Sequence, residues 1–229
     1  MSSMNSIKRL AALGILVSGV ISLNACAPLV VGGAAATTAV VATDRRTAGE
    51  QVEDQSIELK VASRMRQLVD GKGRVNATSY AGVVLLTGDV PDESTKAKAT
   101  EEAQKVEMVK KVYNQLRVGD ITPISVRSND TWITSKVKTA LINAKEVPTR
   151  TMTVTTERGN VYLMGRVTEP EAQRAVKVVS GVKDVNKVVR AFEIISEETL
   201  AKYTEEDKKK EANSQSESND SGVEAIPIE

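Results

Sequence analysis

The sequence predicts an α+β fold made of two copies of one small unit, each in the order αββαβ. Three observations support this prediction. The chain repeats itself at a spacing of 76 to 77 residues, so that ATSYAGVVLLTGDV at 77–90 matches VTTERGNVYLMGRV at 154–167. In each copy, apolar residues recur first at helical spacing and then in alternation. Glycines stand at matching positions between the alternating stretches. An internal duplication of this kind defines the units that fold.

A helix is expected at the start of each copy. Ile57, Val61 and Met65 recur at four-residue spacing in the first copy, which favours one buried helical face. In the second copy, Asn129 or Asp130 is a candidate N-cap. The matching apolar stripe there consists of Ile133, Val137, Ala140 and Leu141.

Two short strands joined by a tight turn are expected next. Gly82 and Gly159 occupy the turns, where a positive φ suits glycine. The expected strands span residues 75–80 and 83–87 in the first copy, and residues 152–156 and 160–164 in the second.

A second helix and a closing strand complete each copy. Pro170 suits the first turn of a helix. Because the last strand is reached through a helix, each copy is expected to form a small three-stranded mixed sheet with two helices on one face. The expected helices span residues 93–106 and 170–180, and the closing strands span residues 112–118 and 188–194.

The N-terminus has the pattern of an export signal. Lys8 and Arg9 precede an apolar stretch at 10–23, which is too short to span a bilayer with margin. The stretch ends just before Cys26, the only cysteine, in a context that resembles a bacterial lipobox. That resemblance implies acylation of Cys26, and Ala27 in place of Asp implies transport to the outer membrane of a Gram-negative cell. An ordinary signal peptide followed by an unrelated cysteine is the alternative.

The net charge of +1 conceals an uneven distribution. Residues 197–229 hold ten acidic and four basic residues, which gives this tail a net charge of −6. Lys8 and Arg9 carry two charges, so residues 26–196 carry +5. This mildly basic body favours an anionic surface. In the tail, residues 198–211 have the composition of a charged helix, and residues 212–222 have too little apolar content to fold.

Enzymatic function is not expected. The chain contains no histidine, which excludes His-based catalytic triads and His metal sites. It contains no phosphate-binding glycine loop, and acylation would block the thiol of Cys26. Aromatic residues make up only 3% of the chain and are not interleaved with basic residues, so nucleic-acid binding is not expected either. No cofactor and no metal site is predicted.

The duplicated unit, with its cores VVLLTGDV and VYLMGRV, resembles the BON domain (bacterial OsmY and nodulation). With the lipobox-like Cys26, a glycine-containing tether and the string SNDTWITSKV at 128–137, the chain resembles the dual BON-domain outer-membrane lipoproteins associated with division and outer-membrane stress. This resemblance implies binding of anionic phospholipid, especially phosphatidylglycerol, through the first helix of the second unit, at 131–143. It also implies a periplasm-facing protein that supports envelope integrity and cell division.

The residues of that helix support the same site independently. When its apolar stripe is buried, Trp132 falls on the outward face near the start of the helix. Tryptophan prefers the water–lipid boundary, and an anionic leaflet attracts nearby lysines. The candidate lipid-binding residues are Trp132, Ser135, Lys136, Lys138, Thr139 and Ile142.

The first copy serves as a comparison for this helix. Ser56 stands where the second copy has Trp132, and Glu58 stands where it has Thr134. The first copy is therefore not expected to bind lipid in this way. A second interpretation stays open, in which Trp132 packs against the first copy or the connector and belongs to an interdomain core.

The sequence leaves two other functions open. One is a protein adaptor, whose sheet faces or acidic tail would contact outer-membrane assembly or division proteins. The other is a haemolysin-like membrane activity, although the chain has no pore-forming apolar hairpin. The expected organisation is a lipoprotein signal peptide at 1–25, the acylated cysteine and a flexible tether at 26–53, a first BON domain at 54–118, a connector at 119–129, a second BON domain at 130–196 and an acidic, largely disordered tail at 197–229.

Overall fold

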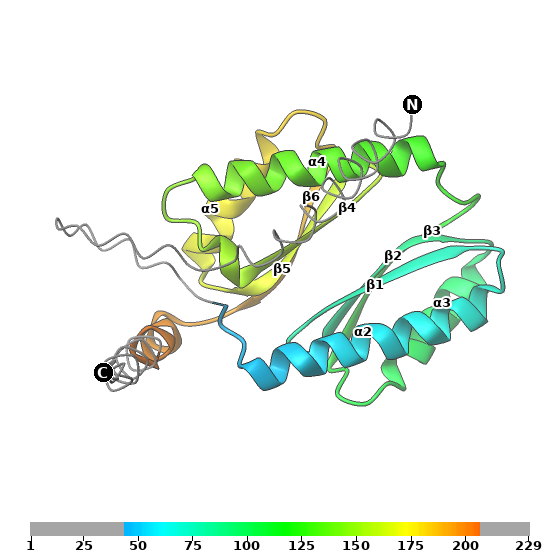
Figure 1. The fold of residues 1–229 in the computed structure, drawn as a ribbon, viewed down its shortest axis with the longest axis horizontal. Coiled ribbons are helices and arrows are strands. Elements are labelled where there is room, and N and C mark those ends of the chain that lie inside the picture. The colour runs from blue at the N-terminus through cyan, green and yellow to red at the C-terminus, as the bar shows by residue number, and fades with distance from the viewer. Residues whose placement is uncertain (1–43, 207–229) are drawn as a thin grey trace, which may run out of the picture. The chain divides into compact units, whose positions relative to one another are not determined.

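The computed structural model describes residues 44–206 (Figure 1), so the expected signal peptide, Cys26 and the end of the tail lie outside the described residues. The first repeat consists of α2 (Ala48–Val69), β1 (Arg74–Tyr80), β2 (Val83–Val90), α3 (Glu93–Gln104) and β3 (Lys111–Val118). The second repeat consists of α4 (Ile124–Asn143), η1 (Thr149–Thr151), β4 (Met152–Glu157), β5 (Asn160–Val167), α5 (Glu169–Ser180) and β6 (Lys187–Ile194).

Both repeats have the predicted αββαβ order and a three-stranded mixed sheet. The middle strand, β2 or β5, pairs antiparallel with the strand before it and parallel with the closing strand. The helices α3 and α5 make the crossover connections to β3 and β6. Each helix pair packs on one face of its own sheet. Tandem α+β units of one topology are therefore confirmed.

Each repeat has its own apolar core between the helices and the sheet. In the second repeat, Ile133, Val137 and Leu141 of α4 are buried as predicted, whereas Ala140 is only partly buried. They pack against Val161 and other apolar residues of β5 and α5. The equivalent core of the first repeat is formed by Ile57, Val61, Met65, Val69, Val84, Leu86, Val90, Ala99, Ala103, Val106 and Leu116.

The two hairpins turn through two residues each. Ala81 and Gly82 have φ values of 53° and 81°, and Arg158 and Gly159 have φ values of 53° and 73°. Positive φ at both positions is the geometry of the type I′ turn, whose twist matches that of the flanking strands. The glycines predicted in the turns therefore occupy the second turn position, where no Cβ opposes this conformation.

The first helix of each repeat begins earlier than the sequence predicted. Before α2, the hydroxyl of Thr47 accepts the Glu50 amide at 3.1 Å, and the Glu50 carboxylate accepts the Thr47 amide at 2.9 Å. This reciprocal capping box starts the helix at Ala48. The expected tether at 26–53 is therefore too long, because its last six residues are helical.

The start of α4 corrects the expected connector in the same way. The carbonyl oxygen of Pro123 accepts the amides of Val126 and Arg127 at 3.1 and 3.2 Å, so α4 begins at Ile124. Asn129 and Asp130, the expected N-cap candidates, therefore lie inside the helix. The expected connector at 119–129 loses its second half to α4.

The sheet faces that the helices leave free contact each other. Tyr80, Ala81 and Leu85 of the first repeat form one buried cluster with Tyr162, Met164 and Ala191 of the second. The contact between repeats extends to a buried ion pair, in which the guanidinium of Arg45 donates to both carboxylate oxygens of Glu171 at 2.8 Å. Contact between the copies therefore adds to a core that would be marginal in one unit of this size.

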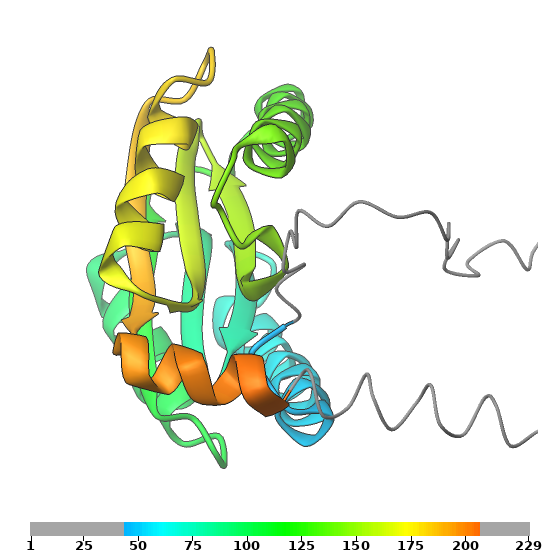
Figure 2. The ribbon, with the colours of Figure 1, turned by 90° about the vertical axis from the view of Figure 1, so that its left-hand side faces the viewer.

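A further helix covers residues 197–206, after β6 (Figure 2). The expected largely disordered tail thus begins with a helical segment. This agrees with the charged-helix composition of residues 198–211, of which the last five lie outside the described residues.

Candidate functional site

The outward face of α4 carries three exposed apolar side chains. Trp132 is 64% exposed, Ile124 is 72% exposed and Ile142 is 68% exposed. Ile124 and Ile142 are separated by roughly five whole turns, so they lie in line along the helix. Because Trp132 faces solvent and not the first repeat, the alternative in which it belongs to an interdomain core is wrong.

Four hydroxyl side chains on the same face form hydrogen bonds within the helix. Ser128, Thr131, Ser135 and Thr139 each donate to the carbonyl oxygen four residues earlier, over 2.9 to 3.1 Å. A hydroxyl without a partner is costly to remove from water. A hydroxyl that bonds to its own helix backbone avoids much of this cost. The outward face can therefore enter a layer poor in water without leaving these groups unpaired.

The two predicted lysines have different surroundings. The ammonium of Lys136 lies 2.6 Å from the Asp184 carboxylate and donates to the carbonyl of Lys183 at 3.1 Å. The hydrogen bond from Lys136 is the main cause that lowers the pKa of Asp184. Lys138 is exposed and has no ion-pair partner within residues 44–206. Of the two, only Lys138 presents a charge that no described acidic residue offsets.

The structure brings five of the six predicted residues to one exposed face. Ser135, Lys138 and Thr139 are exposed beside Trp132 and Ile142, whereas Lys136 is partly buried toward the loop before β6. Sequence reasoning missed three members of the face, which are Ile124, Ser128 and Thr131. Ile124 and Ser128 were missed because the helix was expected to begin at 131. Pro123 was the available signal, since proline favours helix entry.

Asp130 fixes the orientation of α4 on its sheet. Its side chain is buried, and its two carboxylate oxygens accept the backbone amides of Arg158 and Gly159, each at 2.8 Å. These are the two residues of the β4–β5 turn. A helix held to a hairpin through two charge-assisted hydrogen bonds keeps its opposite face directed outward.

Asp54 makes the equivalent contact in the first repeat. Its carboxylate accepts the amides of Ala81 and Gly82 at 2.7 and 2.9 Å and the hydroxyl of Ser79 at 2.6 Å. Burial acts to raise the pKa of Asp54, but the hydrogen bonds from Ser79, Gly82 and Arg46 outweigh it, and the pKa is lowered. The same device therefore holds the first helix of both repeats.

The outward face of α2 differs from that of α4. Ser56, at the position of Trp132, is partly buried. Glu58 does not point outward, because its carboxylate accepts the Ser79 amide at 2.7 Å, and burial is the main cause that raises its pKa. Two exposed apolar residues that sequence reasoning missed, Val52 and Leu59, are each 69% exposed. The contrast between the repeats therefore depends on Trp132 and not on an outward charge of Glu58.

Between residues 44 and 206, no helix combines the length and the apolar character needed to cross a membrane. Within the same range, no three His, Cys, Asp or Glu side chains gather in a way that could hold a metal ion. Cys26, the predicted acylation site, lies outside the described residues.

Comparison with known proteins identifies the repeated unit. The BON domain matches this chain twice, at residues 53–120 and 129–196. The chain is 38% identical over 185 residues to the outer membrane lipoprotein DolP of Haemophilus influenzae, which covers 80% of this chain and 95% of that protein. It is 36% identical over 155 residues to the 21 kDa hemolysin of Actinobacillus pleuropneumoniae, which covers 66% of this chain and 79% of that protein.

A third relative and one solved structure are more distant. The osmotically-inducible protein Y of Escherichia coli is 32% identical over 144 residues, which covers 60% of this chain and 72% of that protein. A structure of CdsD, a structural protein of the type III secretion system of Chlamydia trachomatis, covers 60% of this chain and 94% of that chain at 10% identity and a TM-score of 0.26. This structural likeness is too weak to support an argument. The two domain matches and the DolP relationship establish that this chain belongs to the BON-domain family, as a dual BON-domain outer-membrane lipoprotein.

Proposed function

We propose that this lipoprotein binds anionic phospholipid, with phosphatidylglycerol as the principal ligand, through the outward face of α4. The protein faces the periplasm, and lipid contact by its second repeat supports envelope integrity and cell division. It acts by binding and not by catalysis. The observation that carries the proposal is the 64% exposure of Trp132, the only tryptophan in the chain, on a helix face whose hydroxyls are already paired.

The mode of contact follows from the geometry of the face. Trp132, Ile124 and Ile142 lie along one side of a helix that is held flat on its sheet by Asp130. Such a helix enters the headgroup layer parallel to the membrane surface and does not cross it. The indole ring sits at the boundary, where its apolar body and its N–H both find partners.

The preference for anionic lipid comes from a cation beside this face. Lys138 is exposed and has no ion-pair partner among the described side chains. Each lysine near an anionic surface contributes about 1 kcal/mol, or about five-fold in affinity. Because Asp184 offsets the charge of Lys136, Lys138→Ala should weaken binding to phosphatidylglycerol more than Lys136→Ala does.

An NMR titration tests the proposal residue by residue. The described residues 44–206 contain both repeats with their cores, so a protein that begins after Cys26 can be studied without the acyl anchor, which would bind vesicles on its own. We expect phosphatidylglycerol micelles to shift amide resonances of α4 around Trp132, and phosphatidylcholine micelles to shift them far less. Trp132→Glu should abolish these shifts while the circular dichroism spectrum stays the same.

The matched control is Ser56→Glu, at the equivalent position of α2. It adds the same charge to the other repeat, and it should leave the lipid-induced shifts in α4 intact. Shifts in Trp132→Glu that equal those of the native protein would exclude α4 as the lipid-binding element.

A protein adaptor is a second candidate, supported by Val52 and Leu59 on α2. Both are 69% exposed and lie roughly two turns apart. Exposed apolar residues grouped on one face often mark a protein contact. The double variant Val52→Ser with Leu59→Ser should abolish crosslinks to outer-membrane assembly or division proteins if this face binds them, and it should leave lipid binding unchanged.

The similarity to the 21 kDa hemolysin raises a third candidate, a membrane-damaging activity. We do not expect it of this chain, because no described helix can cross a bilayer. Release of a dye from phosphatidylglycerol vesicles by the purified protein is the measurement that would support it.

A further inference from the structure

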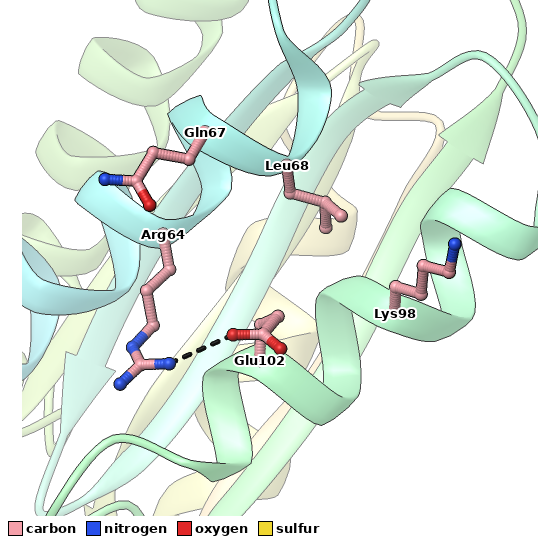
Figure 3. A pocket seen from close by; sticks show the side chains of 5 residues that line it. All are labelled: Arg64, Gln67, Leu68, Lys98 and Glu102. Carbon is pink, nitrogen blue, oxygen red and sulfur yellow. Dashed lines mark hydrogen bonds and ion pairs between the residues drawn. The ribbon is translucent and has the colours of Figure 1, made fainter.

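A groove lies between α2 and α3 of the first repeat, and none of its lining residues belongs to α4. Its volume is about 620 Å³. Arg64, Gln67 and Leu68 line it from α2, and Lys98 and Glu102 line it from α3 (Figure 3). The groove therefore combines one apolar side chain with several charged groups.

The charges of this groove are predominantly positive. The Glu102 carboxylate accepts hydrogen bonds from Arg64 at 3.0 Å and from Lys105 at 2.6 Å. These two bonds, with that from Lys105 the larger, lower the pKa of Glu102, which stays ionised. Lys98 has no ion-pair partner among residues 44–206. The charged residues that line the groove, Arg64, Lys98 and Glu102, have a net charge of +1, and Lys105 offsets part of the charge of Glu102.

The second repeat keeps a cation, Arg174, at the position of Lys98, but it lacks the other charges of this arrangement. At the positions of Arg64, Glu102 and Lys105 it has Ala140, Val178 and Gly181. Val178 packs against the apolar core of the second repeat, whereas Glu102 is held at the surface between two cations. Because the two repeats share their fold, the charged groove is a feature that the fold alone does not require.

The chain itself contains a segment with complementary chemistry. Residues 211–229 contain five acidic residues and no lysine or arginine. The acidic residues are interspersed near the end with Val223, Ile226 and Ile228.

We propose that residues 211–229 bind in the groove between α2 and α3 of the same molecule. Carboxylates of the segment pair with Lys98, Lys105 and Arg64, and one of its isoleucines contacts Leu68. The length of chain is sufficient. Residues 207–229 can extend over roughly 75 Å, whereas a compact body of the described length is roughly 40 Å across.

Photo-crosslinking of the full-length protein in cells tests this contact. Gln67, an exposed residue in the groove, is replaced by the photo-crosslinker p-benzoylphenylalanine. After irradiation, mass spectrometry should find the probe joined to a peptide from residues 211–229 within one molecule. The matched control carries the probe at Asn143, the exposed equivalent in the second repeat, and should give no such product.

Charge reversal tests the electrostatic part of the proposal. Lys98→Glu should lower the yield of the crosslink about three- to five-fold, and adding Glu224→Lys should restore part of it. Lys98 is on the surface, and a thermal melt confirms that its variant is folded. The proposal is overturned by equal yields at Gln67 and Asn143, by a yield that Lys98→Glu does not change, or by adducts at the mass of a dimer or of another protein.

Discussion

Thr78 and Thr155 occupy the same position in the two repeats, and their hydroxyl oxygens lie 3.5 Å apart. A residue that contacts its own counterpart marks an interface in which both partners use the same surface. Here the two partners are halves of one chain, and the contact lies between β1 and β4. The duplicated units thus pair through equivalent strands, as two copies of a symmetric dimer do.

The segment that precedes each repeat contacts the other repeat, so these contacts are reciprocal as well. Thr122, just before the second repeat, donates its amide to the buried carboxylate of Asp89 in the first repeat at 2.7 Å. The guanidinium of Arg166 in the second repeat donates to the carbonyl oxygen of Arg45, just before the first repeat, at 3.3 Å. Asp89 and Arg166 are equivalent positions with opposite charges. Because one side chain accepts hydrogen bonds and the other donates them, each repeat binds a different segment.

This pairing predicts that the two repeats unfold together. Leu85 is buried in the cluster between the sheets, so Leu85→Lys places a charge in the contact and should split urea unfolding into two transitions. Amide resonances assigned to each repeat measure the two midpoints separately by NMR. In the native protein the midpoints should coincide.

The neighbouring Leu86 provides the control for Leu85. It faces the helices on the opposite side of β2 and belongs to the core of the first repeat alone. Leu86→Ala should lower stability by about 2–5 kcal/mol and leave one shared transition. Two transitions in this variant, or one in Leu85→Lys, would contradict the coupling through the sheets.

The buried pair of Arg45 and Glu171 predicts strong coupling between the repeats. Its side chains are almost fully buried, and removal of one member of a buried pair leaves an uncompensated charge. Arg45→Met should therefore cost about 3–5 kcal/mol in the free energy of unfolding. The double variant with Glu171→Gln should recover more than half of this loss in urea denaturation, because no unpaired charge remains.

The exposed ion pair of Arg190 and Glu169 is a control that shows how much of the stability loss in Arg45→Met comes from burial of the charge. Arg190 and Glu169 lie 2.6 Å apart, and both remain accessible to water. Arg190→Met should change stability by less than about 1 kcal/mol. A similar cost for Arg45→Met and Arg190→Met would show that the buried pair does not tie the repeats together.

The sequence predicts the features of this fold that depend on neighbouring residues. The stripe of Ile57, Val61 and Met65 is local, because its members are one turn apart, and all three are buried. The turn glycines are also local signals. The outward side of α4 follows from its buried stripe, so the exposed position of Trp132 was predictable to the same extent.

Contacts between distant residues were beyond this kind of prediction. By helix position, Lys136 and Lys138 are both expected to flank the outward face. Lys136 instead pairs with Asp184, which lies 48 residues further on. Arg45 belongs to the expected flexible tether, but it pairs with Glu171, which lies 126 residues away. No periodic pattern encodes such pairs, because each depends on how the two repeats and their loops pack.

The carboxylate of Asp130 predicts a specific loss of stability. Asp130→Asn replaces one acceptor oxygen by an NH₂ group that faces a backbone amide of the β4–β5 turn. We expect a loss of about 1–3 kcal/mol in the free energy of unfolding. Asp54→Asn should cost more, because Ser79 and Arg46 also donate to Asp54. Asp120→Asn, at an exposed position, is the control and should be nearly neutral in the same urea measurements.

The pKa of Glu58 is raised in the folded protein, mainly by burial. The unfolded value for glutamate is about 4.3. A raised folded pKa means that the folded state holds the proton more tightly, so ionised Glu58 destabilises the protein at neutral pH. This cost disappears as the pH falls through the folded pKa. Glu58→Gln keeps the acceptor for the Ser79 amide and should raise the urea midpoint at pH 7.

The two carboxylates of α2 should therefore respond to acid in opposite directions. At pH 7, Glu58→Gln stabilises and Asp54→Asn destabilises, because the pKa of Asp54 is lowered and its ionised form is favoured in the folded state. The stability from Asp54 is present above its unfolded pKa of about 3.9 and is lost as the pH falls through the lower folded value. Urea midpoints measured from pH 7 to pH 3 should show the gain from Glu58→Gln vanishing while the loss from Asp54→Asn shrinks. A constant gain across this range would mean that ionisation of Glu58 is not its cause.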